Sequence, residues 1–270
     1  MRLHERTTAL RAAGRKALVP YLSAGYPDRA AFRRLLRATA DAGCDVVEVG
    51  VPFSDPVADG PVIQAAGHAA LAGGATLRTA LDDAGEHAAA TGASVVLMTY
   101  LNPVLRLGLD VFVDAAADAG LAGVILPDVP REESAQARAA LRGRGLDLVD
   151  LAAPTSGDDR LRAIAADARG FLYLVSLTGV TGSVLDTSGG VLDFVRGVQS
   201  LTDTPCYVGF GVAEPAQAAA LGRVADGAIV GSALLRRIGQ AGGADAAVDA
   251  ARRYLTEMNA ALNGGQEDVR

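Results

Sequence analysis

Eight short apolar runs recur along the 270-residue chain, and longer segments rich in alanine and arginine separate them. Each run is almost continuously apolar rather than alternating, which is typical of parallel strands buried on both faces. The separating segments have helical patterns, and Gly43 and Gly120 follow two of them where a helix would end. The predicted strands span residues 17–22, 45–51, 94–100, 122–128, 146–153, 170–177, 205–211 and 227–233.

Eight strand–helix units in one unbroken chain predict a (β/α)₈ barrel, and a doubly wound open sheet is the alternative. The barrel is favoured by the number of units and by a length close to the roughly 250 residues typical of that fold. Residues 40–52 and 117–130 repeat one design, in which a helix end and a glycine precede a buried strand and a proline-rich loop. We expect a single domain over residues 1–270, with the barrel at about 17–255 and a short tail at about 263–270.

Composition and charge exclude several classes of protein. The net charge of −6 is interspersed, aromatic residues make up 4% and tryptophan is absent, so nucleic acid is not expected as a partner. No apolar stretch has the length of a membrane span or of a secretory signal, which indicates a cytoplasmic protein. Cys44 and Cys206 lie at the edges of apolar runs and are expected to be buried. No metal site is expected, because His4, His68 and His87 lack ligand spacing.

Glu48 lies inside the second predicted strand. In a strand it shares one face with Val46 and Gly50, while Val47 and Val49 occupy the other face and should meet the helices. Active sites of barrels lie at the carboxyl ends of the strands, so Glu48 should point into the barrel mouth. Burial there would raise its pKa and suit it to general acid and base work near neutral pH. The alternative is a buried glutamate satisfied by an arginine or by backbone donors.

Three further side chains are candidates for the same mouth. Asp55 and Asp59 lie in the loop "PFSDPVADGP", where aspartate before proline or glycine is also ordinary turn chemistry. Their place beside Glu48 favours an acid–base role for one of them. Tyr173 shares a strand face with Phe171 and is either a core residue or a hydroxyl that reaches the mouth.

Glycine-rich segments follow the last three predicted strands, at residues 179–182, 209–211 and 231–233. Glycine lets the backbone approach a ligand closely, and barrels often bind phosphate after strands 7 and 8 at the start of a short helix. Ser232 would open such a helix. The pattern predicts a phosphate site, and close helix–strand packing is the alternative reading.

Lysine occurs once, as Lys16, just before the first predicted strand. A Schiff-base mechanism needs a lysine, and none lies at a strand end. Any mechanism that forms a lysine Schiff base would therefore have to use Lys16.

Five motifs, in order between about residues 17 and 238, together resemble the tryptophan synthase alpha subunit family. The first is highly specific, whereas the glycine motifs also occur in other phosphate-binding barrels. They are "VEVGVPFSDPVADGPVIQAA", "MTYLNPVLRLG", "GVILPDVPREE", "YLVSLTGVTG" and "GFGV" with "DGAIVGSA".

The resemblance implies a (β/α)₈ barrel that cleaves indole-3-glycerol phosphate to indole and glyceraldehyde 3-phosphate. Glu48 then matches the family residue that moves protons and protonates indole C3. Asp59 matches the residue that binds the indole N–H. Tyr173 matches an active-site tyrosine. The implied phosphate contacts are Gly182, Phe210, Gly211, Gly231 and Ser232. The implied lining of the apolar indole slot is Tyr21, Leu97 and Leu126.

The resemblance also implies a partner, a tryptophan synthase beta subunit in an α₂β₂ complex. Pyridoxal phosphate would be bound only by that partner, and this chain would carry no cofactor. Leu177 stands where many bacterial members have arginine, and the whole loop 177–190 departs from the common pattern, so coupling to a partner stays open. The alternatives are a free-standing lyase that releases indole, a weakly active subunit that activates its partner, and another sugar-phosphate barrel such as an isomerase.

Overall fold

The computed structural model describes residues 2–175, 190–209 and 211–264. Its strands are all parallel and form one sheet in the order β5-β4-β3-β2-β1-β9-β8-β7-β6. The strands are β1 (Ala17–Ser23), β2 (Val46–Gly50), β3 (Ser94–Met98), β4 (Gly123–Ile125), β5 (Asp147–Leu148), β6 (Asp150–Ala152), β7 (Leu172–Val175), β8 (Cys206–Gly209) and β9 (Gly227–Val230).

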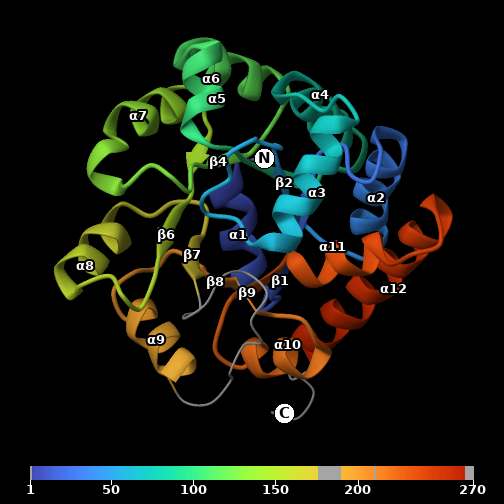
Figure 1. The fold of residues 1–270 in the computed structure, drawn as a ribbon. Helices are drawn as coiled ribbons and strands as arrows, with labels where there is room; N and C mark the ends of the chain where they lie inside the picture. Colours follow the sequence, from blue (N-terminus) through green and yellow to red (C-terminus); the bar gives the residue numbers. More distant parts are fainter. Residues whose placement is uncertain (1, 176–189, 210, 265–270) are drawn as a thin grey trace.

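The sheet closes because one predicted strand pairs on both sides. Only Val149 separates β5 from β6, and this continuous segment pairs with β4 through its first half and with β7 through its second half. The two ends of the sheet therefore meet in a nearly closed barrel (Figure 1). The predicted eight-unit barrel is confirmed, and the open-sheet alternative is wrong.

Helices surround the barrel (Figure 1). Gly43 and Gly120 follow α2 and α6 with φ of 76° and 74°, a conformation that favours glycine, so both predicted helix ends are confirmed. The helices are α1 (Leu3–Ala12), α2 (Arg29–Asp41), α3 (Pro61–Ala72), α4 (Leu77–Thr91), α5 (Leu101–Leu107), α6 (Leu109–Asp118), the short 3₁₀ helix η1 (Arg131–Glu133), α7 (Ala135–Gly143), α8 (Asp158–Asp167), α9 (Gly190–Gln199), α10 (Pro215–Gly222), α11 (Ser232–Gly239) and α12 (Ala244–Asn263).

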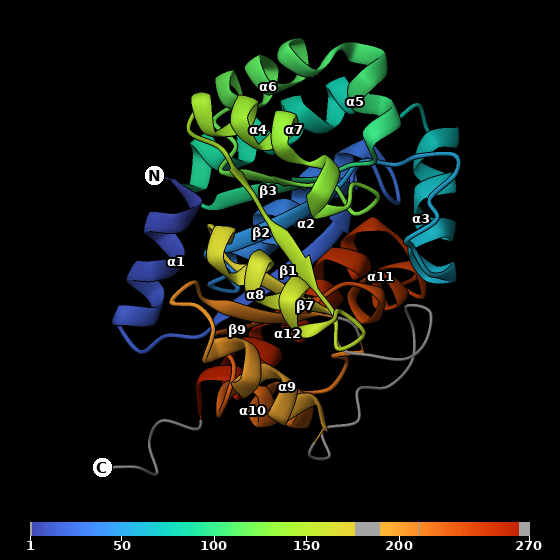
Figure 2. The ribbon, with the colours of Figure 1, turned by 90° about the vertical axis from the view of Figure 1, so that its left-hand side faces the viewer.

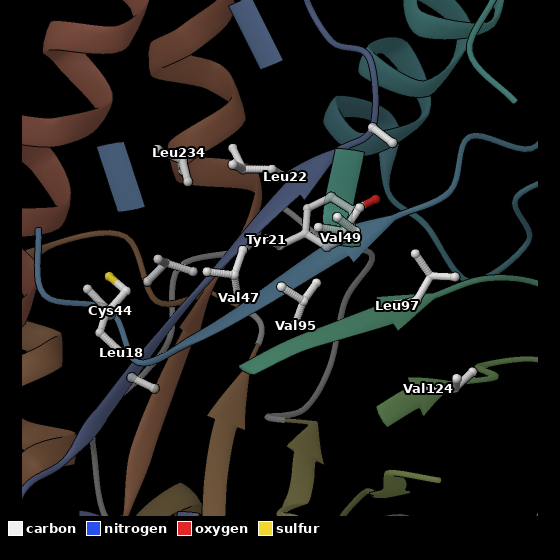
Figure 3. Close-up of a cluster of buried hydrophobic side chains, with 14 of the residues drawn as sticks. Leu18, Tyr21, Leu22, Cys44, Val47, Val49, Val95, Leu97, Val124 and Leu234 are labelled. Atoms are coloured by element: carbon white, nitrogen blue, oxygen red, sulfur yellow. The ribbon is translucent and has the colours of Figure 1, made fainter. Parts of the chain in front are cut away.

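Two apolar clusters occupy the two faces of the sheet. The inner cluster fills the barrel and consists of Leu3, Leu10, Ala17, Val19, Val46, Val96, Ala122, Ile125, Val149, Phe171, Tyr173, Tyr207 and Ile229. The outer cluster packs the sheet against the helices and includes Leu18, Leu22, Val47, Val49, Val95, Leu97 and Val124 (Figure 3). Val46 thus faces the interior while Val47 and Val49 face the helices, which confirms the predicted faces of β2.

Helix α1 closes the amino-terminal end of the barrel, an element to which the sequence patterns assigned no role. Leu3 and Leu10 belong to the inner cluster, and the Thr7 hydroxyl donates to the carbonyl of Gly170 at the start of the β7 segment. Figure 2 places α1 at the end of the barrel opposite α3. The interior is therefore sealed at one end, which leaves the carboxyl end for a site.

Two smaller expectations concern burial and membranes. Cys44 and Cys206 are both buried and free, as predicted. Within the described ranges, no helix combines the length and apolarity that crossing a membrane requires.

We expect Leu3→Ala to lower the free energy of unfolding by about 2–5 kcal/mol, because it empties a site in the inner cluster where the side chain is 0% exposed. The matched control is Leu201→Ala, since Leu201 is 39% exposed and should cost less than about 0.5 kcal/mol. Urea unfolding of both variants gives the two values. Equal costs would contradict the role of α1 as part of the core.

Candidate active site

Glu48 is a buried carboxyl group at the mouth end of β2. It is 1% exposed and pairs in register with Tyr21 on β1, so both side chains share the inner face. Burial, followed by the nearby charge of Asp59, raises the pKa of Glu48 to about 8. An ion pair with arginine would lower the pKa instead. Its Oε2 atom is buried without a hydrogen-bond partner among the described residues, so the group holds a proton at neutral pH.

Asp59 lies half-buried in the loop between β2 and α3. Burial raises the pKa of Asp59 to about 6, while a hydrogen bond from the Tyr100 hydroxyl opposes that rise. The backbone holds the residue in place, because its N–H donates to the Pro56 carbonyl at 3.0 Å and its carbonyl accepts from the Gln64 side chain at 2.8 Å. Asp59 is therefore mostly ionised at neutral pH while Glu48 is protonated.

Asp55 behaves as a turn residue. Its side chain is exposed and accepts a hydrogen bond from the Ser54 hydroxyl at 2.5 Å, and its carbonyl accepts from the Val57 N–H at 3.0 Å. Of the two loop aspartates, Asp59 is the one whose charge acts on Glu48.

Two tyrosines flank the buried glutamate. Burial, together with the nearby carboxylates, raises the pKa of Tyr21 and of Tyr173 far above the usual value, so both hydroxyls remain donors. Each ring lies over a strand-end glycine: a Cβ added at Gly50 would lie 2.0 Å from the Tyr21 oxygen, and one at Gly209 would lie 2.4 Å from the Tyr173 oxygen. The glycines make room for hydroxyls at the mouth.

The predicted phosphate end lies on the same rim. Helix α11 begins at Ser232 as expected, with Gly231 at its N-cap, and both residues are partly exposed. Gly211 has φ of 77°, which favours glycine. A Cβ at Gly231 would lie 3.4 Å from the Tyr21 Cβ, so this rim adjoins the carboxyl groups. Two other predicted contacts lie outside the described residues, Gly182 and Phe210.

The structure corrects two residues of the expected indole slot. Leu97 pairs in register with Val49 and faces the helices with it (Figure 3). Leu126 belongs to the outer cluster and follows the inward-facing Ile125, so it faces the helices too. At these two strand ends the interior positions are Met98, which pairs with Gly50, and Ile125 in the inner cluster. The error is one position in each strand, and a shift of one residue turns a side chain to the opposite face.

The sequence patterns missed Tyr100, which follows β3 and is 3% exposed. Its hydroxyl accepts a hydrogen bond from the Ala58 N–H at 3.1 Å and donates to Asp59. The available signal was an aromatic residue directly after the strand that neighbours β2.

The sole lysine lies away from this mouth. Lys16 directly precedes β1, at the closed end, where its N–H donates to the Asn263 side chain at 2.9 Å. The described ranges contain no group of three histidine, cysteine or acidic side chains placed to hold a metal ion.

Comparison with known proteins identifies the family. A family model described as "Tryptophan synthase alpha chain" matches residues 7–263. The chain belongs to this family. A tryptophan synthase alpha chain from Burkholderia pseudomallei (strain 1106a) is 44% identical over 265 residues, covering 97% of each chain. Another from Nitratidesulfovibrio vulgaris (strain DP4) is 46% identical over 243 residues, covering 90% of this chain and 95% of the relative.

Solved structures agree with the sequence relatives. Tryptophan synthase from Mycobacterium tuberculosis includes a chain that superposes with a TM-score of 0.88 at 40% identity, covering 97% of this chain and 98% of the other. The tryptophan synthase subunit alpha of Legionella pneumophila str. Paris gives a TM-score of 0.90 at 34% identity, covering 98% and 99%.

The chain is therefore a carbon–carbon lyase of tryptophan biosynthesis that cleaves indole-3-glycerol phosphate to indole and glyceraldehyde 3-phosphate. In this family pyridoxal phosphate belongs to the beta subunit. The resemblance inferred from the five motifs is confirmed, and an unrelated sugar-phosphate barrel is excluded.

We expect Glu48→Gln to change how stability depends on pH. The folded state holds a proton on Glu48 between its ordinary pKa of 4.5 and about 8, whereas the unfolded state has released it. Folding therefore becomes less favourable as the pH rises through this window, by up to about 1.4 kcal/mol per pH unit.

The variant removes that titration, so its stability relative to the wild type should be higher at about pH 9 than at about pH 5. Urea unfolding at the two pH values measures the difference, with the exposed Asp55→Asn as a control that should show none. The same relative stability of Glu48→Gln at both pH values would contradict a raised pKa.

Proposed function

We propose that Glu48 and Asp59 divide the acid–base work of the cleavage at this mouth. The observation that carries the proposal is the Glu48 carboxyl group, buried and with Oε2 unpartnered among the described residues, next to a carboxyl group of lower pKa. Two carboxyl groups whose environments separate their pKa values can serve as acid and anion at one pH.

In the proposed reaction, protonated Glu48 donates its proton to C3 of the indole ring. The Asp59 carboxylate accepts a hydrogen bond from the indole N–H and stabilises the positive charge that develops on the ring. The bond between C3 and the side chain then breaks, and its electron pair returns to the ring to give indole. The adjacent hydroxyl of the side chain becomes the aldehyde of glyceraldehyde 3-phosphate and passes its proton to the Glu48 carboxylate, which restores the starting state.

The remaining rim would orient the substrate. Tyr173 offers a protonated hydroxyl beside Glu48, and Tyr21 lines the apolar slot with Met98 and Ile125. Backbone N–H groups would bind the phosphate at the start of α11 and in the preceding loops. The residues proposed for that contact are Gly182, Phe210, Gly211, Gly231 and Ser232.

We also propose that the chain works with a tryptophan synthase beta subunit in an α₂β₂ complex, with no cofactor on this chain. Support comes from the matching chain in the Mycobacterium tuberculosis tryptophan synthase and from a sole lysine that lies away from the mouth. A single barrel domain over residues 1–270 and a cytoplasmic location belong to the same proposal, and free buried cysteines suit that compartment.

Two alternatives stay open, and the first is motivated by the departure of loop 177–190 from the family pattern, although residues 177–189 lie outside the described residues. One is a free-standing lyase that releases indole, and the other is a weakly active subunit that mainly activates its partner. The three possibilities differ in how the cleavage rate responds to a beta subunit.

We expect the purified chain to release indole slowly from indole-3-glycerol phosphate and to be accelerated by an added beta subunit. Fast release that is indifferent to the beta subunit would establish the free-standing lyase. Absence of cleavage both alone and in the complex would establish the partner-activating role.

We expect kcat/KM to rise with pH through about 6, as Asp59 ionises, and to fall through about 8, as Glu48 loses its proton. Asp59→Asn should lower cleavage by roughly 10²-fold or more, and Glu48→Gln should abolish most of it while substrate still binds.

A pH–rate profile and binding measurements on both variants test these assignments. The matched control is Asp55→Asn, which changes an exposed carboxylate in the same loop and should keep both limbs of the profile. Near-normal turnover by Glu48→Gln would overturn the mechanism.

A further inference from the structure

Tyr100 connects two loops of the mouth. It follows β3 in sequence, yet its hydroxyl bonds two successive residues of the loop after β2: it accepts from the Ala58 N–H at 3.1 Å and donates to the Asp59 carboxylate. One oxygen atom thus bonds the backbone next to Asp59 and also acts on the Asp59 carboxylate, whose pKa it lowers.

The ring of Tyr100 contacts the first part of the same loop, at Phe53. Its centroid lies 5.3 Å from that of Phe53, with the planes tilted by 32°. Such pairs contribute beyond the area they bury. Between Phe53 and Ala58 the loop extends outward to Val57, which is 83% exposed. The exposed part of the loop is therefore flanked on both sides by contacts with one tyrosine.

Tyr100 is itself anchored from a third loop. It is the N-cap residue of α5, and the first N–H of that helix, from Leu101, donates to both carboxylate oxygens of Asp128 at 3.0 and 3.1 Å. Asp128 follows β4. Residues that follow three consecutive strands thus meet here: Asp128 bonds the backbone next to Tyr100, and the Tyr100 hydroxyl bonds the loop that carries Asp59.

We propose that Tyr100 is a positioning residue for the cleavage reaction, which holds the Asp59 carboxylate where it meets the indole N–H. The inference rests on the role proposed for Asp59. Without the hydroxyl, the Ala58 N–H and the Asp59 carboxylate would both lose a partner, and the ring contact with Phe53 would be the only one of these contacts between Tyr100 and the loop to remain.

The hydroxyl of Tyr100 stays a donor across the working pH range. Burial, and then the charge of Asp59, raise the pKa of Tyr100 above its usual value, so the phenol keeps its proton. If Tyr100 only packed in the core, its hydroxyl would not be needed and phenylalanine would replace it without loss. An experiment that removes the hydroxyl alone therefore distinguishes a positioning role from a packing role.

The test compares Tyr100→Phe with the wild type in indole release from indole-3-glycerol phosphate across pH. We expect kcat to fall about 10- to 100-fold, the scale for one hydrogen bond to a charged group, with a much smaller change in KM. The acid limb of the pH–rate profile, which is the rise in rate as Asp59 ionises, should move to higher pH, because the lost hydrogen bond had been lowering the pKa of Asp59. Carbon-13 NMR of the Asp59 carboxyl would register the same upward shift.

Two matched variants separate positioning from packing. Phe53→Leu removes the ring contact but keeps the hydroxyl, so it should leave the acid limb in place. Tyr254→Phe removes a hydroxyl that donates to the Ala213 carbonyl at 3.1 Å, away from the mouth, and should change neither kcat nor the profile. Thermal unfolding verifies that each variant is folded.

The outcomes distinguish this inference from the proposed function. If Asp59→Asn loses cleavage but Tyr100→Phe keeps the wild-type kcat and acid limb, the positioning role is wrong while the proposed site stands. A lower kcat with an unmoved acid limb and an unchanged Asp59 pKa would likewise overturn it in favour of packing. If Asp59→Asn itself cleaves normally, the proposed function fails and this inference fails with it.

Discussion

The burial of one carboxyl group, Glu48, is the constraint on which the mouth depends. A carboxyl group with a pKa of about 8 requires surroundings that stabilise the protonated form over the charged form. The barrel supplies them through its inner cluster, which α1 seals at the opposite end. Among the residues that the structure describes, no arginine lowers the pKa of Glu48. The same interior would also exclude water from a reacting indole ring.

The second carboxyl group follows a different principle. In the proposed mechanism Asp59 is the anion, and it lies in a half-buried loop where it receives hydrogen bonds rather than a purely apolar environment. Its proximity also raises the pKa of Glu48, so the loop that carries the anion helps to keep the acid protonated. A loop in another position would change both groups at once, which explains why the backbone around Asp59 is bonded to Pro56, Gln64 and Tyr100.

Much of the fold could be predicted from local patterns. Continuous apolar runs mark strands buried on both faces, and alternation within β2 correctly placed Glu48 on the inner face and Val47 on the outer one. Leu97 and Leu126 were assigned wrongly because motif matching locates a strand end but does not by itself fix which neighbour faces inward. Applying the alternation that worked for β2, together with its register to β3, would have selected Met98.

Other features depend on contacts that no local pattern contains. The closure by α1 brings Leu3 beside Gly170, and the link from Tyr100 to Asp59 joins two loops more than forty residues apart in sequence. From the sequence alone, a tyrosine directly after a strand is interpreted as a core residue, whether or not its hydroxyl forms a functional hydrogen bond.

Two glycines at the strand ends, Gly50 and Gly209, make room for the tyrosine rings at the mouth. Gly50 and Gly209 end their strands without side chains, and the space thus left is occupied by the rings of Tyr21 and Tyr173. Any larger residue at either position would push a hydroxyl away from Glu48, because the space available to a Cβ is less than the distance of normal contact. The two strand-end glycines therefore make room for two protonated phenols near the protonated Glu48 carboxyl group.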